Sequence, residues 1–459
     1  MENINQQKNP LGCEPVKVLL GKFAIPSVIA FLVNNLYNLV DQIFIGQGVG
    51  YLGNAATTVA FPVVTISLSL AMLFGSGASA YAAIKLGEDK QKIAEKVLNN
   101  VFVILVIVGI IIAVLGIAFL KPMLIMFGAT DKVMQYATDY TSIILIGTPF
   151  MTLGAGLSNM VRTDGNPRLS MISMVVGALI NTILDPIYIF VFNWGVKGAA
   201  IATITSQIIS AIIICYYFMK KSKMRLIKSQ FKLDFMLIKN FTVLGIASSV
   251  TQLAITILVV VLNNALVYYG NQSPVGGDVA LSAMGIVMKV SSILIGVNIG
   301  ISVGAQPIIG FNMGAMQFKR VKETYIVAVL SATAFSVIGW IWCVFFPGSI
   351  LKIFGTQDIV FAEFAEKCMR IYLFSIFASG FIIVTTGYFQ ATGQPFKASV
   401  LSMLRSLLLL VPLIIILPLY FGLDGILYAG PVAEFITLAV VSIFIIKEIR
   451  VLNEKFVQF

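Results

Sequence analysis

Two groups of polar side chains in the first half of the chain follow a helical spacing and could bind a small cation. The first group is Asn34, Asn38 and Asp41, and the second is Gly177, Asn181, Asp185 and Tyr188. Residues spaced by three, four or seven positions share one face of an α-helix, so each group would form a polar stripe that contains an acid. Carboxylate and amide oxygens are hard ligands that suit a small cation. The spacing therefore predicts a site for H⁺ or Na⁺, although polar groups that merely satisfy one another would show the same pattern.

Each stripe has a proline beside it. Pro26 lies two turns before Asn34, and Pro186 directly follows Asp185. A proline inside a helix removes a backbone hydrogen bond and can kink the helix. We therefore expect bendable helices at both places, and Pro186 should free the backbone carbonyl of Thr182.

The two acids should lie at a similar depth in their helices. Asp41 follows Lys22 and Asp185 follows Arg168, each by about five helical turns. Burial and like-charge repulsion both disfavour a pair of ionised carboxylates. A proton or a sodium ion would relieve that repulsion equally well, and the sequence leaves both ions open. The chain contains no histidine, which excludes a histidine relay.

The second half of the chain has no equivalent pair of acids but offers other groups that could line a substrate cleft. These candidates are Gln252, Asn263, Met284, Met288, Lys289, Arg405 and Glu434. Charged residues within a membrane span face the protein interior or water by default, and methionines suit varied apolar ligands. The charged side chains could instead form a structural ion pair, and the methionines could be ordinary packing.

The elements that carry these residues are long and apolar. Of the 459 residues, 58% are hydrophobic and only 11% are Asp, Glu, Lys or Arg, whereas a soluble domain has about 25% charged residues. A helix of about 20 apolar residues spans the hydrocarbon core of a bilayer, and twelve such stretches follow one another. The sequence therefore predicts an all-α polytopic membrane protein with twelve transmembrane helices, surrounded by the lipid bilayer.

Four short motifs recur at a nearly constant distance along the chain. The pairs are Phe127–Asp131 with Phe354–Asp358, Gly165–Pro167 with Gly393–Pro395, Gly195–Gly198 with Gly422–Gly425, and Gly77 with Gly304, and the residue numbers differ by 227 or 228 in every pair. Each half holds six spans, an even number, so both halves enter the membrane in the same direction. This predicts two six-helix lobes related by a pseudo-twofold axis along the membrane normal. The lobes would be residues 1–219 and 241–459, joined by a basic linker at 220–240.

Basic residues gather on one side of the expected membrane. With the N-terminus inside, the inside segments hold 23 Lys and Arg residues and the outside segments hold six. This asymmetry is typical of cytoplasmic loops, so we expect a multi-pass protein of the cytoplasmic membrane with both termini in the cytoplasm. The net charge of +11 then reflects basic loops and indicates no nucleic-acid partner.

The chain shows no sign of ATP-driven or enzymatic chemistry. It has no Gly-Lys-Ser/Thr phosphate-binding loop, which is the usual cradle for nucleotide phosphates. Asp41 and Asp185 could imitate an aspartyl-protease dyad, but neither lies in a Gly-rich catalytic motif. We therefore expect a transporter that is not an enzyme, has no cofactor, and uses H⁺ or Na⁺ as coupling ion.

Three longer motifs lie in order on the expected helices of the first half. They are Ile25-Pro26 leading to Val40-Asp-Gln-Ile-Phe-Ile-Gly46, Arg162-Thr-Asp-Gly-Asn-Pro167, and Asn181-Thr-Ile-Leu-Asp-Pro186. Together they resemble the multidrug and toxic compound extrusion (MATE) family in its prokaryotic form, over nearly the whole chain. The resemblance implies alternating-access export of small organic, mostly cationic compounds in exchange for H⁺ or Na⁺. We expect the protein to function as a monomer.

The resemblance also implies which residues bind the coupling cation. By matching position these are Asp41, Asn181 and Asp185, with Thr203 at the expected spacing on the next helix. Some family members use acids of the seventh and tenth helices for a second site, and this sequence has none deep in those helices. The alternative is a flippase for lipid-linked saccharides from the wider superfamily, which would have a strongly basic cleft and often two extra helices.

Overall fold

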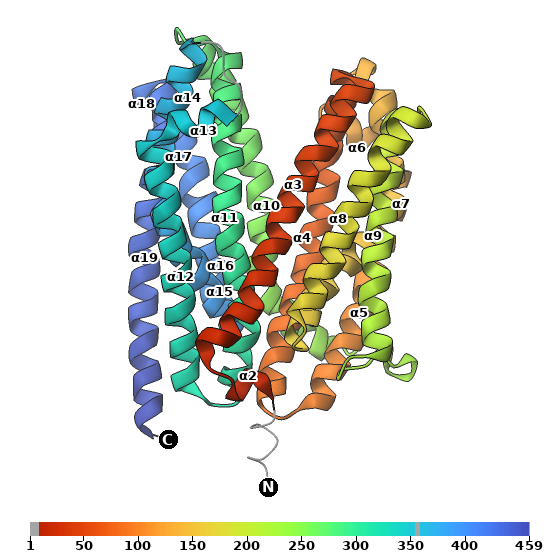
Figure 1. The fold of residues 1–459 in the computed structure, drawn as a ribbon, viewed down its shortest axis with the longest axis vertical. Helices are drawn as coiled ribbons and strands as arrows, with labels where there is room; N and C mark the ends of the chain where they lie inside the picture. Colours follow the sequence, from red (N-terminus) through yellow and green to blue (C-terminus); the bar gives the residue numbers. More distant parts are fainter. Residues whose placement is uncertain (1–8, 354–358, 459) are drawn as a thin grey trace.

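The chain folds into a set of long helices. The computed structural model describes residues 9–353 and 359–458, and every regular element within these ranges is helical (Figure 1). The first half contains α2 (Pro10–Cys13), α3 (Val16–Val49), α4 (Tyr51–Gly87), α5 (Gln91–Ala118), α6 (Leu120–Met126), α7 (Asp131–Thr163), α8 (Pro167–Pro186), the π-helix η1 (Ile187–Val191) and α9 (Gly195–Lys220). The second half contains η2 (Lys228–Gln230), α10 (Phe235–Asn271), α11 (Gly277–Gly314), α12 (Phe318–Phe345), α13 (Pro347–Ile353), α14 (Ile359–Tyr372), η3 (Ile376–Ala378), α15 (Ser379–Ala391), α16 (Pro395–Met403), the π-helix η4 (Leu404–Leu410), α17 (Val411–Ile416), α18 (Pro418–Phe421) and α19 (Leu423–Gln458).

The prediction of a twelve-span membrane protein is confirmed. Within the described ranges, 11 helices are long and apolar enough to cross a membrane, and a twelfth span is the pair Phe361–Tyr372 and Ile376–Ala391, bent by 44°. Large side chains on these helices point outward and are exposed, as expected where lipid replaces water as the neighbour.

The two halves repeat one architecture. The bounds of α5 and α12 differ by 227 in residue number at both ends, and so do those of α6 and α13. The repeated glycines mark equivalent turns, because Gly165 and Gly393 have positive φ angles of 95° and 75° that only glycine adopts easily. The second copy of the Phe127 motif, at 354–358, lies outside the described residues. The repeat produces two lobes, with α3–α9 in the first and α10–α19 in the second.

The lobes stand side by side and meet at one end of the molecule. We call this the terminal end, because α2 starts there and α19 finishes there (Figure 1). In Figure 1, α3 leans from the second lobe at the terminal end toward the first lobe at the opposite end. It packs against α11 in its first half and against α8 beyond.

Glycines allow backbones of the two lobes to touch near the terminal end. A Cβ atom added to Gly77 of α4 would overlap the carbonyl oxygen of Phe241 in α10, and one added to Gly245 would overlap the carbonyl oxygen of Leu73. Gly314 of α11 makes the same kind of contact with α4. We call Gly77, Gly245 and Gly314 the glycine seam.

Hydrogen bonds between the lobes accompany the glycine seam. The hydroxyl groups of Ser69 in α4 and Ser249 in α10 lie 2.7 Å apart. The amide of Gln390 in α15 donates to the Ser76 hydroxyl of α4 at 3.2 Å, and its bond to the Leu244 carbonyl at 3.1 Å, within the second lobe, holds it in place. Buried polar groups are costly without partners, so these bonds favour the closed terminal end.

Asp164 fastens the predicted linker at 220–240 to the first lobe. Its carboxylate accepts hydrogen bonds from the Tyr217 hydroxyl and the Ser222 hydroxyl, both at 2.6 Å, and from the Met224 backbone at 3.3 Å. Burial raises the pKa of Asp164, while these hydrogen bonds oppose the rise. Residues 235–240 of that linker already belong to α10, whose first turn is capped by Asp234.

Candidate cation site

Asp41 of α3 and Asp185 of α8 face each other inside the first lobe. Asp41 is 8% exposed and Asp185 is fully buried at 0%. Their carboxyl groups lie within hydrogen-bonding reach of each other, since α3 and α8 pack side by side. Two carboxyl groups this close in an apolar lobe carry a large electrostatic cost if both are ionised.

A third helix completes the site. The buried Asn181 side chain donates to Asp185 Oδ1 at 3.3 Å and to the Thr203 hydroxyl of α9 at 3.4 Å. Asn181 and Asp185 are one helical turn apart, so α8 presents both to the same neighbours. The structure thus brings together all four residues that the resemblance implies for cation binding: Asp41, Asn181, Asp185 and Thr203.

Oxygen atoms at this site lack partners. Asp41 Oδ1, Asn181 Oδ1 and Asp185 Oδ2 are buried and accept no hydrogen bond from any described residue. An unsatisfied buried acceptor costs about 1–3 kcal/mol, and a charged one costs more. Two carboxylate oxygens and one amide oxygen suit either a shared proton or a small cation held by oxygen ligands.

Two tyrosines that the sequence analysis did not single out lie near the acids. Tyr37 of α3 and Tyr140 of α7 both interact electrostatically with Asp41 and Asp185. Tyr37 lies four residues before Asp41, so the helical spacing could have found it. Tyr140 has no such signal, because only the packing of α7 in the lobe brings it close.

The supporting amides Asn34 and Asn38 lie on α3, and within the described ranges neither side chain forms a hydrogen bond with Asp41 or Asp185. Asn38 is exposed, and its side chain donates to the backbone carbonyl of Asn34 at 2.7 Å. Tyr188 also lies elsewhere, because the chain enters the π-helix η1 after Pro186 and the helical register changes. Its ring stands 5.2 Å from that of Trp194, in an aromatic cluster with Phe192.

The two prolines occupy different structural positions. Pro26 is buried within α3, which continues from Val16 to Val49 without interruption. Pro186 ends α8 beside Asp185, and η1 follows at once. π-Helical turns often occur at functional sites, and here the irregular turn directly adjoins the acid pair.

In the second lobe, Arg405 and Glu434 form an ion pair. The Arg405 Nε atom lies 2.8 Å from Glu434 Oε2, and the two side chains are 23% and 7% exposed. Arg405 lies in the π-helix η4. Lys289 takes no part in this pair, so two of the three charged residues predicted for the second-lobe cleft are joined to each other and Lys289 is separate from them.

The other second-lobe candidates divide between core and surface. Met284 is 1% exposed and belongs to the apolar core of that lobe, against which Met288 packs. Gln252 is half-buried and Asn263 is exposed, both on α10. Packing therefore accounts for Met284, while the amides of Gln252 and Asn263 form no hydrogen bond with any residue that the structure describes.

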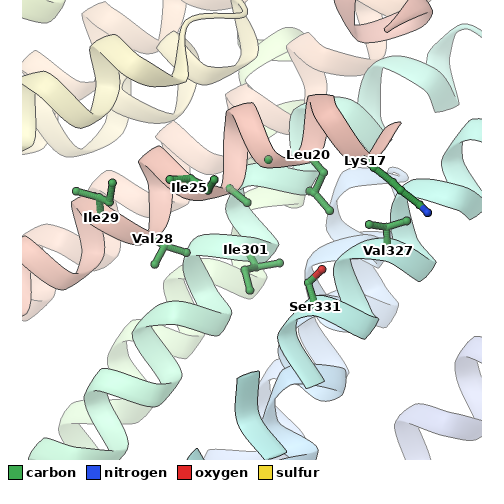
Figure 2. A pocket seen from close by; sticks show the side chains of 10 residues that line it. Lys17, Leu20, Ile25, Val28, Ile29, Ile301, Val327 and Ser331 are labelled. Atoms are coloured by element: carbon green, nitrogen blue, oxygen red, sulfur yellow. The ribbon is translucent and has the colours of Figure 1, made fainter. Parts of the chain in front are cut away.

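A separate cavity of about 320 Å³ lies along the first half of α3. Figure 2 shows Lys17 at one end and the side chains of Ile25, Val28, Ile301 and Val327 along it, from α3, α11 and α12. It contains none of the predicted site residues, so the acid pair and this cavity are distinct features.

The fold and the site together define a class of protein. Two homologous six-span lobes, a buried acid pair and an irregular helix beside it are features of a secondary transporter. The sequence profile of the MatE family matches residues 26–187 and 253–416. The chain belongs to the MatE family of multidrug efflux transporters, and it is not an enzyme.

Relatives and solved structures agree with this assignment. The multidrug export protein MepA of Staphylococcus aureus (strain MRSA252) is 26% identical over 421 residues, covering 92% of this chain and 91% of MepA. MepA of Staphylococcus haemolyticus (strain JCSC1435) is 26% identical over 435 residues, covering 93% and 92%.

Among solved structures, the MATE multidrug transporter DinF-BH in complex with rhodamine 6G is 32% identical, with a TM-score of 0.88 and coverage of 96% and 98%. An outward-facing multidrug resistance MATE transporter of the MOP superfamily has a TM-score of 0.88 at 21% identity, covering 99% of both chains, which shows a shared fold.

Proposed function

We propose that the protein exports small organic compounds in exchange for H⁺ or Na⁺ bound at Asp41 and Asp185. The observation that carries this proposal is the buried acid pair with unpartnered carboxylate oxygens on both members. The names of relatives support the substrate class, since MepA is a multidrug export protein and DinF-BH was solved with rhodamine 6G.

The membrane potential favours such an exchange. Moving one positive charge outward costs about 2.3 kcal/mol per 100 mV of opposing potential. Importing one H⁺ or Na⁺ for each monovalent cationic substrate cancels that electrical cost. The chemical gradient of the coupling ion is then available to drive export.

We also propose that the terminal end lies in the cytoplasm. The basic linker Lys220–Lys239 and the basic start of α12 lie on this side of the predicted topology. In that orientation the glycine seam closes the cytoplasmic side, and the structure represents the state that is closed inside. Alternating access would require the lobes to separate at the seam.

Transport by purified protein in liposomes tests this proposal. Efflux of rhodamine 6G would be followed under an imposed pH or Na⁺ gradient for the wild type and for Asp185→Asn, which keeps the shape but removes the charge. We expect one gradient to drive the wild type and Asp185→Asn to be inactive. Asp131→Asn is the matched control, because Asp131 is an exposed acid of the same lobe, in the first turn of α7.

Two results would contradict the proposal. The first is that neither gradient moves dye through the wild type, and the second is that Asp185→Asn transports as well as the wild type. Melting temperatures of the variants separate loss of function from loss of folding. The gradient that succeeds identifies the coupling ion.

A further inference from the structure

Lys289 is an isolated cation at membrane depth. Its side chain is exposed, and it forms no ion pair with any residue in the described ranges. Along α11, which begins at Gly277, it lies about 18 Å from the start of the helix. A charge this deep in a span faces the protein interior or a wet space, because lipid would make it costly.

The contacts of α11 show which way Lys289 faces. A Cβ atom added to Gly304 would lie 2.7 Å from the Cα atom of Ala24 in α3. One added to Gly300 would lie 2.6 Å from the Cα atom of Val28. One at Gly296 would lie 3.0 Å from the side-chain nitrogen of Asn35. These three glycines therefore mark the side of α11 that faces α3, the first-lobe helix that also packs against the second lobe.

Lys289 continues this α3-facing side beyond the last contact. It precedes Gly296 by seven residues, which is two helical turns and the same face. Gly285, one turn further from the terminal end, has no atom within 4 Å of an added Cβ. The packing of α11 on α3 thus ends between Gly296 and Lys289, and open space begins there.

Lys289 and the acid pair lie at a similar height on opposite lobes. Asn35 and Gly296 are in contact, and from this level Asp41 lies six residues along α3 and Lys289 seven residues along α11. At about 1.5 Å per residue the two positions are about 9 Å and about 10 Å further from the terminal end. The acid pair is buried inside the first lobe, and the ammonium group of Lys289 is exposed on the second lobe at nearly the same height.

We propose that Lys289 is a specificity-determining residue that binds an acidic group of the substrate, a carboxylate or a sulfonate. The cationic part of the same molecule would face the first lobe, so the site would favour zwitterionic compounds. Arg405 does not compete for this role, because its guanidinium group already forms an ion pair with Glu434, with Nε 2.8 Å from Oε2. The inference rests on the proposed export function, since it takes the space between the lobes as the substrate path.

Two dyes that differ in one functional group test the proposal. Rhodamine 6G is an ethyl ester with one positive charge, and rhodamine 19 is the corresponding free acid, a zwitterion at neutral pH. Their binding to the full-length protein in lipid nanodiscs would be measured by fluorescence anisotropy, without any ion gradient. The quantity of interest is the Kd of the acid divided by the Kd of the ester.

We expect Lys289→Gln to raise this ratio about 10-fold, the size of one hydrogen bond between charged groups. Lys289→Arg should keep the ratio within about threefold, because it keeps the charge. Lys132→Gln is the matched control, since Lys132 is an exposed lysine at the start of α7.

The proposal is overturned if Lys289→Gln leaves the ratio unchanged, if it weakens both dyes equally, or if the wild type does not bind the acid. Because binding needs no gradient, these outcomes are independent of the transport experiment. If Lys289→Gln raises the Kd ratio as expected but no gradient drives efflux by the wild type, the exchange mechanism is refuted. The binding role of Lys289 is then still supported.

Discussion

Adding one methyl group to the glycine seam should shift the protein toward the state that is open at the terminal end. In Gly245→Ala the new Cβ would overlap the Leu73 carbonyl oxygen and lie 2.7 Å from its carbon and 3.1 Å from Leu73 Cα. Backbone atoms cannot rotate away as a side chain can, so α4 and α10 must separate. Only the state with a closed seam is affected.

The size of the shift follows from the cost of overpacking. Inserting a methyl group into a closely packed contact typically costs about 1–3 kcal/mol. Since about 1.4 kcal/mol corresponds to a tenfold change, the ratio of open to closed molecules should rise about 5- to 150-fold.

Spin labels at surface positions that correspond in the two repeats can measure the ratio of open to closed molecules. Lys92 of α5 and Lys319 of α12 are exposed near the terminal end, one on each lobe and each the second residue of its helix. Labelled cysteines at these positions, in a background without the four native cysteines, would report the distance between lobes by pulsed electron paramagnetic resonance. We expect one short distance in the parent and an added longer distance in Gly245→Ala.

The control is Gly154→Ala in α7, where an added Cβ meets no atom within 4 Å. It should leave the distance distribution unchanged. The reasoning fails if Gly245→Ala also leaves the distribution unchanged, or if Gly154→Ala broadens it to the same extent.

Two further predictions concern stability. Arg405→Gln should lower the melting temperature, because an isolated buried carboxylate at Glu434 costs about 3–5 kcal/mol. Adding Glu434→Gln should restore most of this loss. Equal melting temperatures for the single and the double variant would argue against a structural ion pair. Arg320→Ala removes donors that hold the backbone carbonyls of Leu11 and Glu14 at 3.2 and 2.7 Å. We expect faster cleavage of the N-terminal segment in limited proteolysis, with unchanged cleavage disproving this role.

The sequence was most informative where helical periodicity alone decides a position. The helices that carry Asp41 and Asp185 enter the membrane from the same side. Each acid lies about five helical turns beyond a basic residue at the start of its helix, so the sequence alone places the two acids at a similar depth. The internal repeat likewise follows from local turns, since Gly165 and Gly393 need positive φ angles. Such features depend on the chain nearby and can be read without a structure.

Features that depend on packing between distant segments could not be read in this way. Tyr140 reaches the acids only through the position of α7, and Tyr188 leaves the polar stripe because η1 changes the helical register after Pro186. The pairing of Arg405 with Glu434, and not with Lys289, also depends on how η4 and α19 meet. No spacing in the sequence distinguishes the two basic partners.

Helix α3 offers a physical route from cation binding to movement of the lobes. Its first half is anchored to the second lobe, with Ala24 and Val28 against glycines of α11, while Asp41 in its second half faces Asp185 of the first lobe. A ligand shifts a conformational equilibrium only by binding one state more tightly than the other. A site divided between α3 and α8 meets this requirement, because any tilt of α3 changes the distance between the carboxylates. Loading a cation at Asp41 and Asp185 would therefore favour whichever lobe arrangement brings these acids together, and releasing it would allow their repulsion to drive the helices apart.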